Sequence, residues 1–168
     1  NVGFIVLIFL LAFGRLNLFL RSGITIAGLI FYLILTGASA SVFRATVMAV
    51  VLIVAYLSNR SKHLINSIAI AALVILIIDP NELYDAGFQL SFSAVISMAL
   101  LYPPIEQMIT ELSIKNKIIR YFILMIGLSL SAQIGTLPFT FYYFSKFSTV
   151  SLLANLIVIP AIGVVTGI

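Results

Sequence analysis

The chain is a series of long hydrophobic runs that are separated by short polar segments. A helix that spans a membrane needs about 20 apolar residues, with a range near 17–25. These runs therefore predict an all-α fold, a polytopic transmembrane helix bundle of about seven spans, the first of them truncated. The expected spans are 2–13, 22–38, 42–57, 64–78, 88–102, 118–137 and 148–168.

The second and third spans come from one apolar stretch, residues 24–56. A single helix over this stretch would be about 50 Å long, whereas the hydrocarbon core of a membrane is about 30 Å thick. The small residues from Gly37 to Ser41 permit a tight turn or a close helix approach, so we expect the break there. Both spans are short, and a pair of re-entrant half-spans remains an alternative.

Five segments between the spans are expected to be loops, and the first of them is Gly14–Gly23, which carries Arg15 and Arg21. Asn59–Lys62 is polar, Asp79–Gly87 is acidic, Pro103–Lys117 is polar and opens with two prolines, and Pro138–Phe147 is aromatic. The last two loops begin at prolines because proline lacks a backbone N–H and usually ends or kinks a helix.

The composition excludes an ordinary soluble domain. Of the 168 residues, 62% are hydrophobic and 8% are charged, against about 45–50% and about 25% in soluble domains. Because the chain starts and ends within apolar runs, we expect residues 1–168 to be one transmembrane domain of a longer membrane protein.

The basic residues predict the orientation of the spans. Two of the nine, Arg44 and Lys146, fall on one side of the expected membrane, and the other seven fall on the opposite side. Cytoplasmic loops are enriched in Lys and Arg, so the side with seven is assigned to the cytoplasm and the acidic loop to the outside. The seven are Arg15, Arg21, Arg60, Lys62, Lys115, Lys117 and Arg120.

The residue types argue against catalysis. The chain has no cysteine and one histidine, His63, which excludes disulfides, thiol nucleophiles and clustered-histidine metal sites. It contains no phosphate-binding loop, dinucleotide fingerprint, zinc-protease helix or nucleophile elbow. We therefore expect no enzymatic activity, no metal and no cofactor.

Arg44 stands out because it lies just inside an expected span. A charged side chain in a membrane segment usually faces the bundle interior or a water-filled cavity, and the alternative is an arginine that extends to the lipid headgroups. We predict that Arg44 pairs with Asp79 or Asp85, which fall on the same side of the membrane.

Asp79-Pro80-Asn81-Glu82 has the pattern of a helix start. Asp79 suits the N-cap, Pro80 the first helical position, and Glu82 the position from which a side chain returns to the cap. The alternative is an acidic mouth that binds cations or orders Arg44.

Two expected spans each combine a face of small residues with a stripe of polar ones. A polar stripe in a span indicates either hydrogen bonds between helices or the lining of a pore. The small faces are Gly87, Ser91 and Ala94 in one span and Gly127, Ser131 and Gly135 in the other. The polar stripes are Gln89, Ser93 and Ser97, and Ser129, Gln133 and Thr136.

The segment from Pro138 to Phe147 holds six aromatic residues and Lys146. Aromatic residues gather at membrane interfaces. The alternative is a platform on which the bases of single-stranded nucleic acid stack. Asn155 and Pro160 interrupt the last expected span.

Three stretches together resemble the membrane domain of the ComEC-type competence proteins, the bacterial DNA-internalisation channel family. They are 37–45; Asp79-Pro80 with 85–92; and Gln133, Pro138 and 144–148 with 153–156 and Pro160. The resemblance covers about residues 35–160. Ala40 departs from it, because the family often has proline there.

The resemblance implies a multi-pass channel domain in the bacterial cytoplasmic membrane, surrounded by membrane lipid, that passes single-stranded DNA into the cell during natural transformation. Its implied partners are the DNA-receptor and motor proteins of the competence machinery, and a homo-oligomer is a further option. A small-molecule or ion transporter and a structural assembly domain remain alternatives. On the channel interpretation, the candidates for the DNA path or gate are Arg44, Gln89, Ser93, Ser97, Ser129, Gln133, Thr136 and Lys146.

Overall fold

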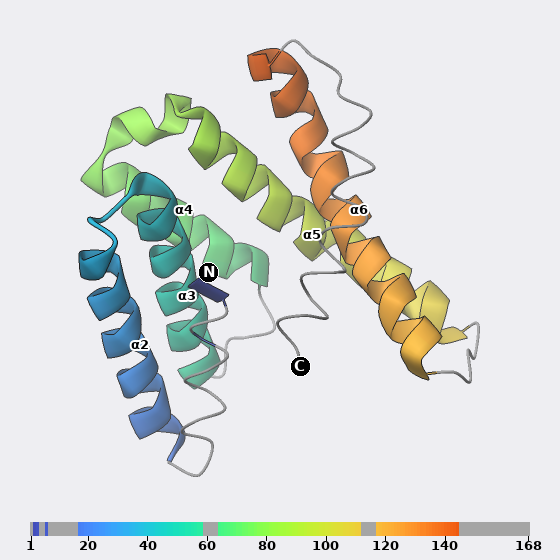
Figure 1. Ribbon diagram of the computed structural model, residues 1–168, viewed down its shortest axis with the longest axis horizontal. Coiled ribbons are helices and arrows are strands. Elements are labelled where there is room, and N and C mark those ends of the chain that lie inside the picture. Colours follow the sequence, from blue (N-terminus) through green and yellow to red (C-terminus); the bar gives the residue numbers. More distant parts are fainter. Residues whose placement is uncertain (1, 4–5, 7–16, 59–63, 112–116, 145–168) are drawn as a thin grey trace. The chain divides into compact units, whose positions relative to one another are not determined.

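The computed structural model describes residues 2–3, 6, 17–58, 64–111 and 117–144, and this part of the chain consists of helices with short connections and contains no strand. Its elements, shown in Figure 1, are α2 (Leu18–Leu35), α3 (Ala40–Leu57), α4 (Leu64–Ile78), the 3₁₀ helix η1 (Pro80–Tyr84), α5 (Ala86–Glu111) and α6 (Lys117–Phe144). The all-α prediction is confirmed for these residues.

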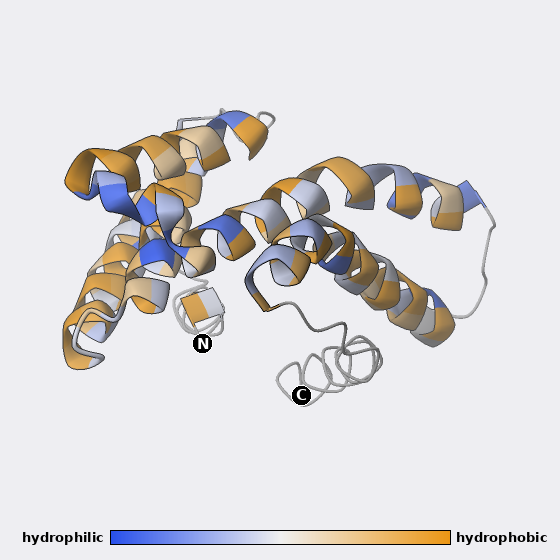
Figure 2. Ribbon diagram, turned by 90° about the horizontal axis from the view of Figure 1, so that it is seen from above, coloured by the Kyte–Doolittle hydropathy of each residue, from blue (hydrophilic) through white to orange (hydrophobic). Residues whose placement is uncertain are grey.

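Four of these helices, α2, α3, α5 and α6, are long and apolar enough to cross a membrane, and α4 is a shorter apolar helix of 15 residues. Hydrophobic residues make up most of each helix (Figure 2). This is fewer than the seven predicted spans. Most of the expected span 2–13, and all of the expected span 148–168, lie outside the described residues.

The break between the second and third expected spans is confirmed. Helix α2 ends in two hydrogen bonds, from Ala38 N to Leu33 O (2.9 Å) and from Gly37 N to Ile34 O (3.1 Å). This pattern is the Schellman motif, which needs a left-handed backbone just after the helix. Gly37 supplies it with a φ of 66°, and Ala38 follows at 51°. The chain then enters α3 at Ala40, where the family resemblance had left the shape of the break open.

The predicted loop 14–23 is wrong from Leu18 on, where α2 begins. Two further predicted loops are wrong over their described residues, because the helices continue through their prolines. Helix α5 runs through Pro103 and Pro104 to Glu111, and α6 runs through Pro138 to Phe144. Proline has a fixed φ near −65°, which suits a helix, and costs it mainly one backbone hydrogen bond and a local clash. Membrane-type helices tolerate this loss when neighbouring groups compensate for it.

The chain divides into two compact units, residues 1–88 and 89–168, with the boundary in the first turn of α5. In the first unit, α3 packs against both α2 and α4, and α4 continues into η1. Its buried side chains include Leu29, Ile75 and Thr25. The Thr25 hydroxyl donates to the Arg21 carbonyl (2.8 Å), so this polar group is satisfied within its own helix. The prediction of a single domain over the whole chain stays a prediction.

Candidate functional site

Arg44 lies in the first turns of α3, and it is 6% exposed. Burying an arginine is costly unless its charge is paired and its N–H groups find acceptors. The chain provides acceptors in the segment between α4 and α5. This segment is short, and its conformation depends on one N-cap at each of its ends.

The first cap is Asp79. Its Oδ1 accepts hydrogen bonds from the backbone N–H and the side-chain amide of Asn81, both at 3.0 Å, and Pro80 follows at the first helical position. The predicted helix start is therefore confirmed for these residues. The element is a 3₁₀ helix, and Glu82 does not have the predicted role of returning to the cap.

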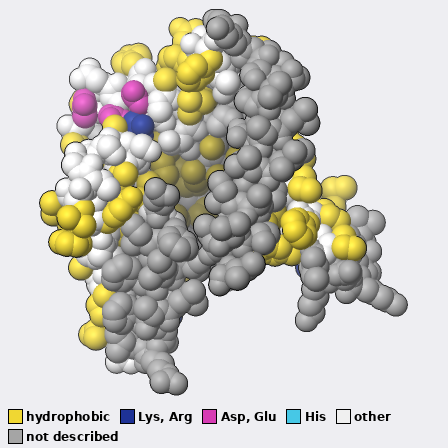
Figure 3. Space-filling view, in the orientation of Figure 1, with side chains coloured by type: hydrophobic (Ala, Val, Ile, Leu, Met, Phe, Trp, Pro, Cys, Tyr) yellow, Lys and Arg dark blue, Asp and Glu magenta, His cyan; other side chains and the backbone are white. Residues whose placement is uncertain are grey.

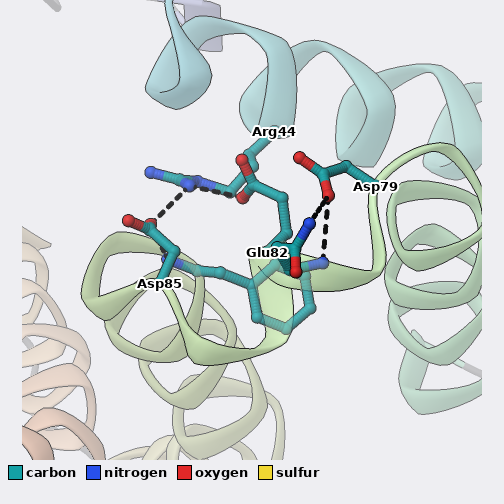
Figure 4. Close-up of polar contacts among 6 residues, drawn as sticks. Arg44, Asp79, Glu82 and Asp85 are labelled. Atoms are coloured by element: carbon teal, nitrogen blue, oxygen red, sulfur yellow. Dashed lines mark hydrogen bonds and ion pairs between the residues drawn. The ribbon is translucent and has the colours of Figure 1, made fainter.

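Glu82 and Asp85 instead bind the guanidinium. Arg44 Nη1 donates to Glu82 Oε2 (2.7 Å) and to Asp85 Oδ1 (2.8 Å), as Figure 4 shows. The side chains are 7%, 18% and 50% exposed in the order Arg44, Glu82 and Asp85. We call these three residues the Arg44 cluster. Figure 3 shows acidic side chains grouped around a basic one on the face in view.

The prediction that Arg44 pairs with Asp79 or Asp85 is thus confirmed, and the partner is Asp85. Sequence reasoning missed Glu82 because the residue fitted a capping pattern. The spacing held a second signal, since a 3₁₀ helix has three residues per turn. Asp85 directly follows η1, three residues after Glu82, and two carboxylates at this spacing suit a guanidinium.

Asp85 also caps α5. Its Oδ1, the same atom that accepts from Arg44, accepts from the backbone N–H of Phe88 at 3.0 Å. A carboxylate at this position favours the positive end of the helix dipole. Asp85 Oδ1 therefore links the start of α5 to the Arg44 side chain of α3. Glu82 links η1 to the same nitrogen atom, Arg44 Nη1.

The second group of interactions lies between α5 and α6. The two helices run antiparallel, because the start of α5 contacts the end of α6 and the end of α5 contacts the start of α6. Tyr143 Oη donates to Gln89 Oε1 (3.0 Å) near one end, and Arg120 Nη2 donates to Thr110 Oγ1 (3.1 Å) near the other. We call this interface the α5–α6 seam.

Between those ends the helices touch through glycines. A Cβ atom at Gly135 would lie 2.6 Å from the Ser93 backbone oxygen and against the Ser97 side chain. A Cβ atom at Gly127 would lie 2.8 Å from Ile105 Cγ2. The polar stripe of α5 therefore meets the small face of α6, and at Gly135 the backbones are too close for another group between them.

The polar stripe of α6 is largely satisfied within its own helix. Thr136 Oγ1 donates to the carbonyls of Ala132 and Gln133, both at 3.1 Å, and Gln133 Nε2 lies 3.5 Å from Ser129 Oγ. Ser129 is buried, and Gln133 Oε1 is buried without a hydrogen-bond partner in the described part of the chain.

These interactions contain no site for a metal. Among the described residues, no group of three or more His, Cys, Asp or Glu side chains could hold an ion. The Arg44 cluster is instead a fixed array of charges that joins three elements.

Comparison with known proteins identifies the family. A model of the family described as Competence protein matches residues 1–168. The chain belongs to the Competence protein family. It is 33% identical over 159 residues to ComE operon protein 3 of Bacillus subtilis (strain 168), a match that covers 90% of this chain. The chain spans about a fifth (19%) of that relative's length. No solved structure matches the chain.

The structure brings together two of the stretches in which the resemblance to competence proteins was found. Residues 37–45 contribute Arg44, and residues 85–92 contribute Asp85 and the start of α5. Within the same stretches, Ser41 is exposed and Ser91 is half-buried. In the third stretch Pro138 is exposed, and Lys146, Asn155 and Pro160 lie outside the described residues.

Proposed function

We propose that this member of the Competence protein family is part of a channel domain through which single-stranded DNA enters the bacterial cytoplasm. The proposal is carried by family membership over all 168 residues. Four apolar helices of spanning length and a buried charge cluster support it. The finer parts of the proposal are about seven spans in the cytoplasmic membrane, with the acidic segment outside.

In this proposal the Arg44 cluster has a structural role and does not present an unpaired positive charge to DNA. The two carboxylates, Glu82 and Asp85, neutralise the guanidinium and leave the cluster with one net negative charge. Such a group would not attract phosphates. Its role is to hold α3, η1 and the start of α5 in one arrangement.

The α5–α6 seam is the candidate gate. DNA phosphates cannot cross hydrocarbon, so the path must be hydrated, and the polar side chains Gln89, Ser93 and Ser97 are available to line it. In the arrangement described, Ser93 and Ser97 lie against Gly135. On this proposal, a path along this stripe requires the two helices to separate.

The remaining parts of the proposal concern energy and partners. The chain itself would supply the passage and no chemistry, so any cleavage of the incoming strand would belong to other segments or proteins. A motor protein would pull the strand from the cytoplasm, and a DNA receptor would deliver it from outside.

The test is uptake of labelled DNA by cells that carry the full-length protein with Arg44→Gln. We expect uptake to be lost while DNA stays bound at the cell surface and the protein reaches the membrane in normal amounts. Arg21→Gln is the matched control, because it removes the same charge from α2, a helix that contributes no side chain to the Arg44 cluster or to the α5–α6 seam. It should leave uptake near normal.

Normal uptake with Arg44→Gln would contradict this role of the cluster. If Gln89→Ala also left uptake unchanged, the alternative of a structural assembly domain would be favoured. Such a domain needs its spans to insert and does not need either side chain.

A further inference from the structure

The contact between Arg44 and the backbone of α5 is closer than the ion pairs alone require. A Cβ atom at Gly87, the second residue of α5, would contact Arg44 Nη2 and lie 3.2 Å from Arg44 Cζ. It would also lie 2.9 Å from Asp85 Oδ1. The guanidinium therefore occupies the volume in which any other residue would have its side chain.

The guanidinium has little freedom to move away. Its Nη1 donates to two carboxylates at 2.7 and 2.8 Å. Asp85 cannot follow a displaced guanidinium, because its Oδ1 also accepts from the Phe88 N–H and thereby caps α5. A shift of Arg44 would lengthen at least one of these bonds, and a charge-assisted bond weakens as it lengthens.

We propose that Gly87 is a positioning residue, whose missing side chain lets Arg44 reach Glu82 and Asp85 and so couples α3 to the start of α5. The role of this coupling in DNA uptake rests on the proposed function, whereas the contact itself does not. Glycine is required here by close approach, because the structure gives Gly87 no left-handed backbone.

The proposal predicts that Gly87→Ala changes stability in the direction opposite to that usual for glycine-to-alanine replacement in a helix. Within a helix, replacing glycine by alanine normally increases stability, because alanine has less backbone entropy to lose. At Gly87 the new methyl group should displace Arg44 and decrease stability. If Arg44 is first truncated to alanine, the conflict with the guanidinium disappears and only the contact with Asp85 Oδ1 is left, so Gly87→Ala should then cost much less stability than in the parent.

A single buried thiol can report on this unit. The chain has no cysteine, and Ala71 of α4 is 1% exposed, in the same unit as the Arg44 cluster. In full-length protein with other cysteines replaced, Ala71→Cys should react with a maleimide only when this unit opens. The labelling rate is then compared for the parent, Gly87→Ala, Arg44→Ala and the double variant, together with DNA uptake.

We expect Gly87→Ala to speed labelling and to reduce uptake. In the Arg44→Ala background, Gly87→Ala should speed labelling by a much smaller factor than it does in the parent, because only the contact with Asp85 Oδ1 is left. Gly87→Ala with Arg44→Lys should label more slowly than Gly87→Ala, because lysine lacks the second terminal nitrogen that the methyl group would meet. Gly23→Ala is the control, since a Cβ atom at Gly23 of α2 has nothing within 4 Å.

The outcomes separate this inference from the proposed function. Equal labelling effects of Gly87→Ala with and without Arg44 would overturn the positioning role, whatever happens to uptake. The expected labelling pattern with unchanged uptake would uphold the positioning role and overturn the part assigned to the cluster in DNA uptake.

Discussion

The Arg44 cluster and the α5–α6 seam join helices by opposite means. The cluster joins its helices through three formal charges, and Gly87 lies against the guanidinium. The seam uses glycines in close contact with the facing helix and neutral hydrogen bonds such as that from Tyr143 to Gln89. Charge is used where an irregular 3₁₀ segment has to be held, and close approach is used where two long, regular helices cross.

This difference has a physical basis. An irregular segment has few side chains to pack, so a pair of directed, charge-assisted bonds contributes most of its fixation. Two apolar helices in lipid gain little from burying one another, and close contact between small residues gives them dispersion energy and interhelical hydrogen bonds. The cluster should therefore respond to changes of charge, and the seam should respond to changes of volume.

Reversing the charge of Arg44 should have the largest effect. Arg44→Glu would place three carboxylates together in a site where the native side chain is 7% exposed. Breaking a buried pair costs about 3–5 kcal/mol, and we expect the lower end because Asp85 is half exposed. The loss would be measured as faster labelling of Ala71→Cys, or as loss of folded protein from the membrane.

Restoring a pair should recover much of this loss. Arg44→Glu combined with Glu82→Arg returns one positive charge to the cluster, and the new arginine on η1 can reach both the substituted residue and Asp85. If the double reversal is no more stable than Arg44→Glu, the charges are not what holds η1 to α3.

The seam should instead be broken by one methyl group. Gly135→Ala would bring a Cβ atom into contact with Ser97 and to 2.6 Å from the backbone oxygen of Ser93. Overpacking costs about 1–3 kcal/mol, and this contact includes backbone, which cannot rotate away. Denaturant-induced unfolding in detergent, monitored by labelling of a thiol in place of the fully buried Ser131, would measure it.

Two further variants sharpen that prediction. Gly127→Ala should cost less, because the atom it meets is the Cγ2 methyl group of a side chain, Ile105. Ser97→Gly should partly rescue Gly135→Ala, because it removes one of the two contacts. Equal costs for the two alanine substitutions would contradict the view that backbone contact at Gly135 sets the spacing of the helices.

The same contrast explains what the sequence predicted well. The turn after α2 was predictable because it depends on local chemistry, a run of small residues with Gly37 in it, and on the length that one span can have. The pairing of Arg44 with Asp85 was predictable because a buried charge needs a partner and few acids were available. Glu82 was missed because its local pattern suited a helix cap equally well.

The errors have a common origin. Pro103 and Pro138 were expected to end helices, since in isolation proline removes a backbone hydrogen bond. Whether a helix continues past proline depends on the neighbours that pack against it, and these are not visible in the pattern of a single helix. In the same way, the stripe of Gln89, Ser93 and Ser97 and the small face of α6 could each be identified from the sequence, but not the contact between them.

The smallest predicted effect is that of salt, and it separates the two regions without any change in their shape. The screening length falls from about 10 Å at 0.1 M ionic strength to about 3 Å at 1 M. Asp85 is half exposed, so part of its attraction to Arg44 should be screened, at a cost of about 0.5 kcal/mol or less. The labelling rate at Ala71→Cys should therefore rise with sodium chloride, and that at Ser131→Cys should stay constant. In the Arg44→Ala background the salt dependence of labelling at Ala71→Cys should disappear. Equal salt responses of the two thiols would mean that charge contributes no more to the stability of the cluster than to that of the seam.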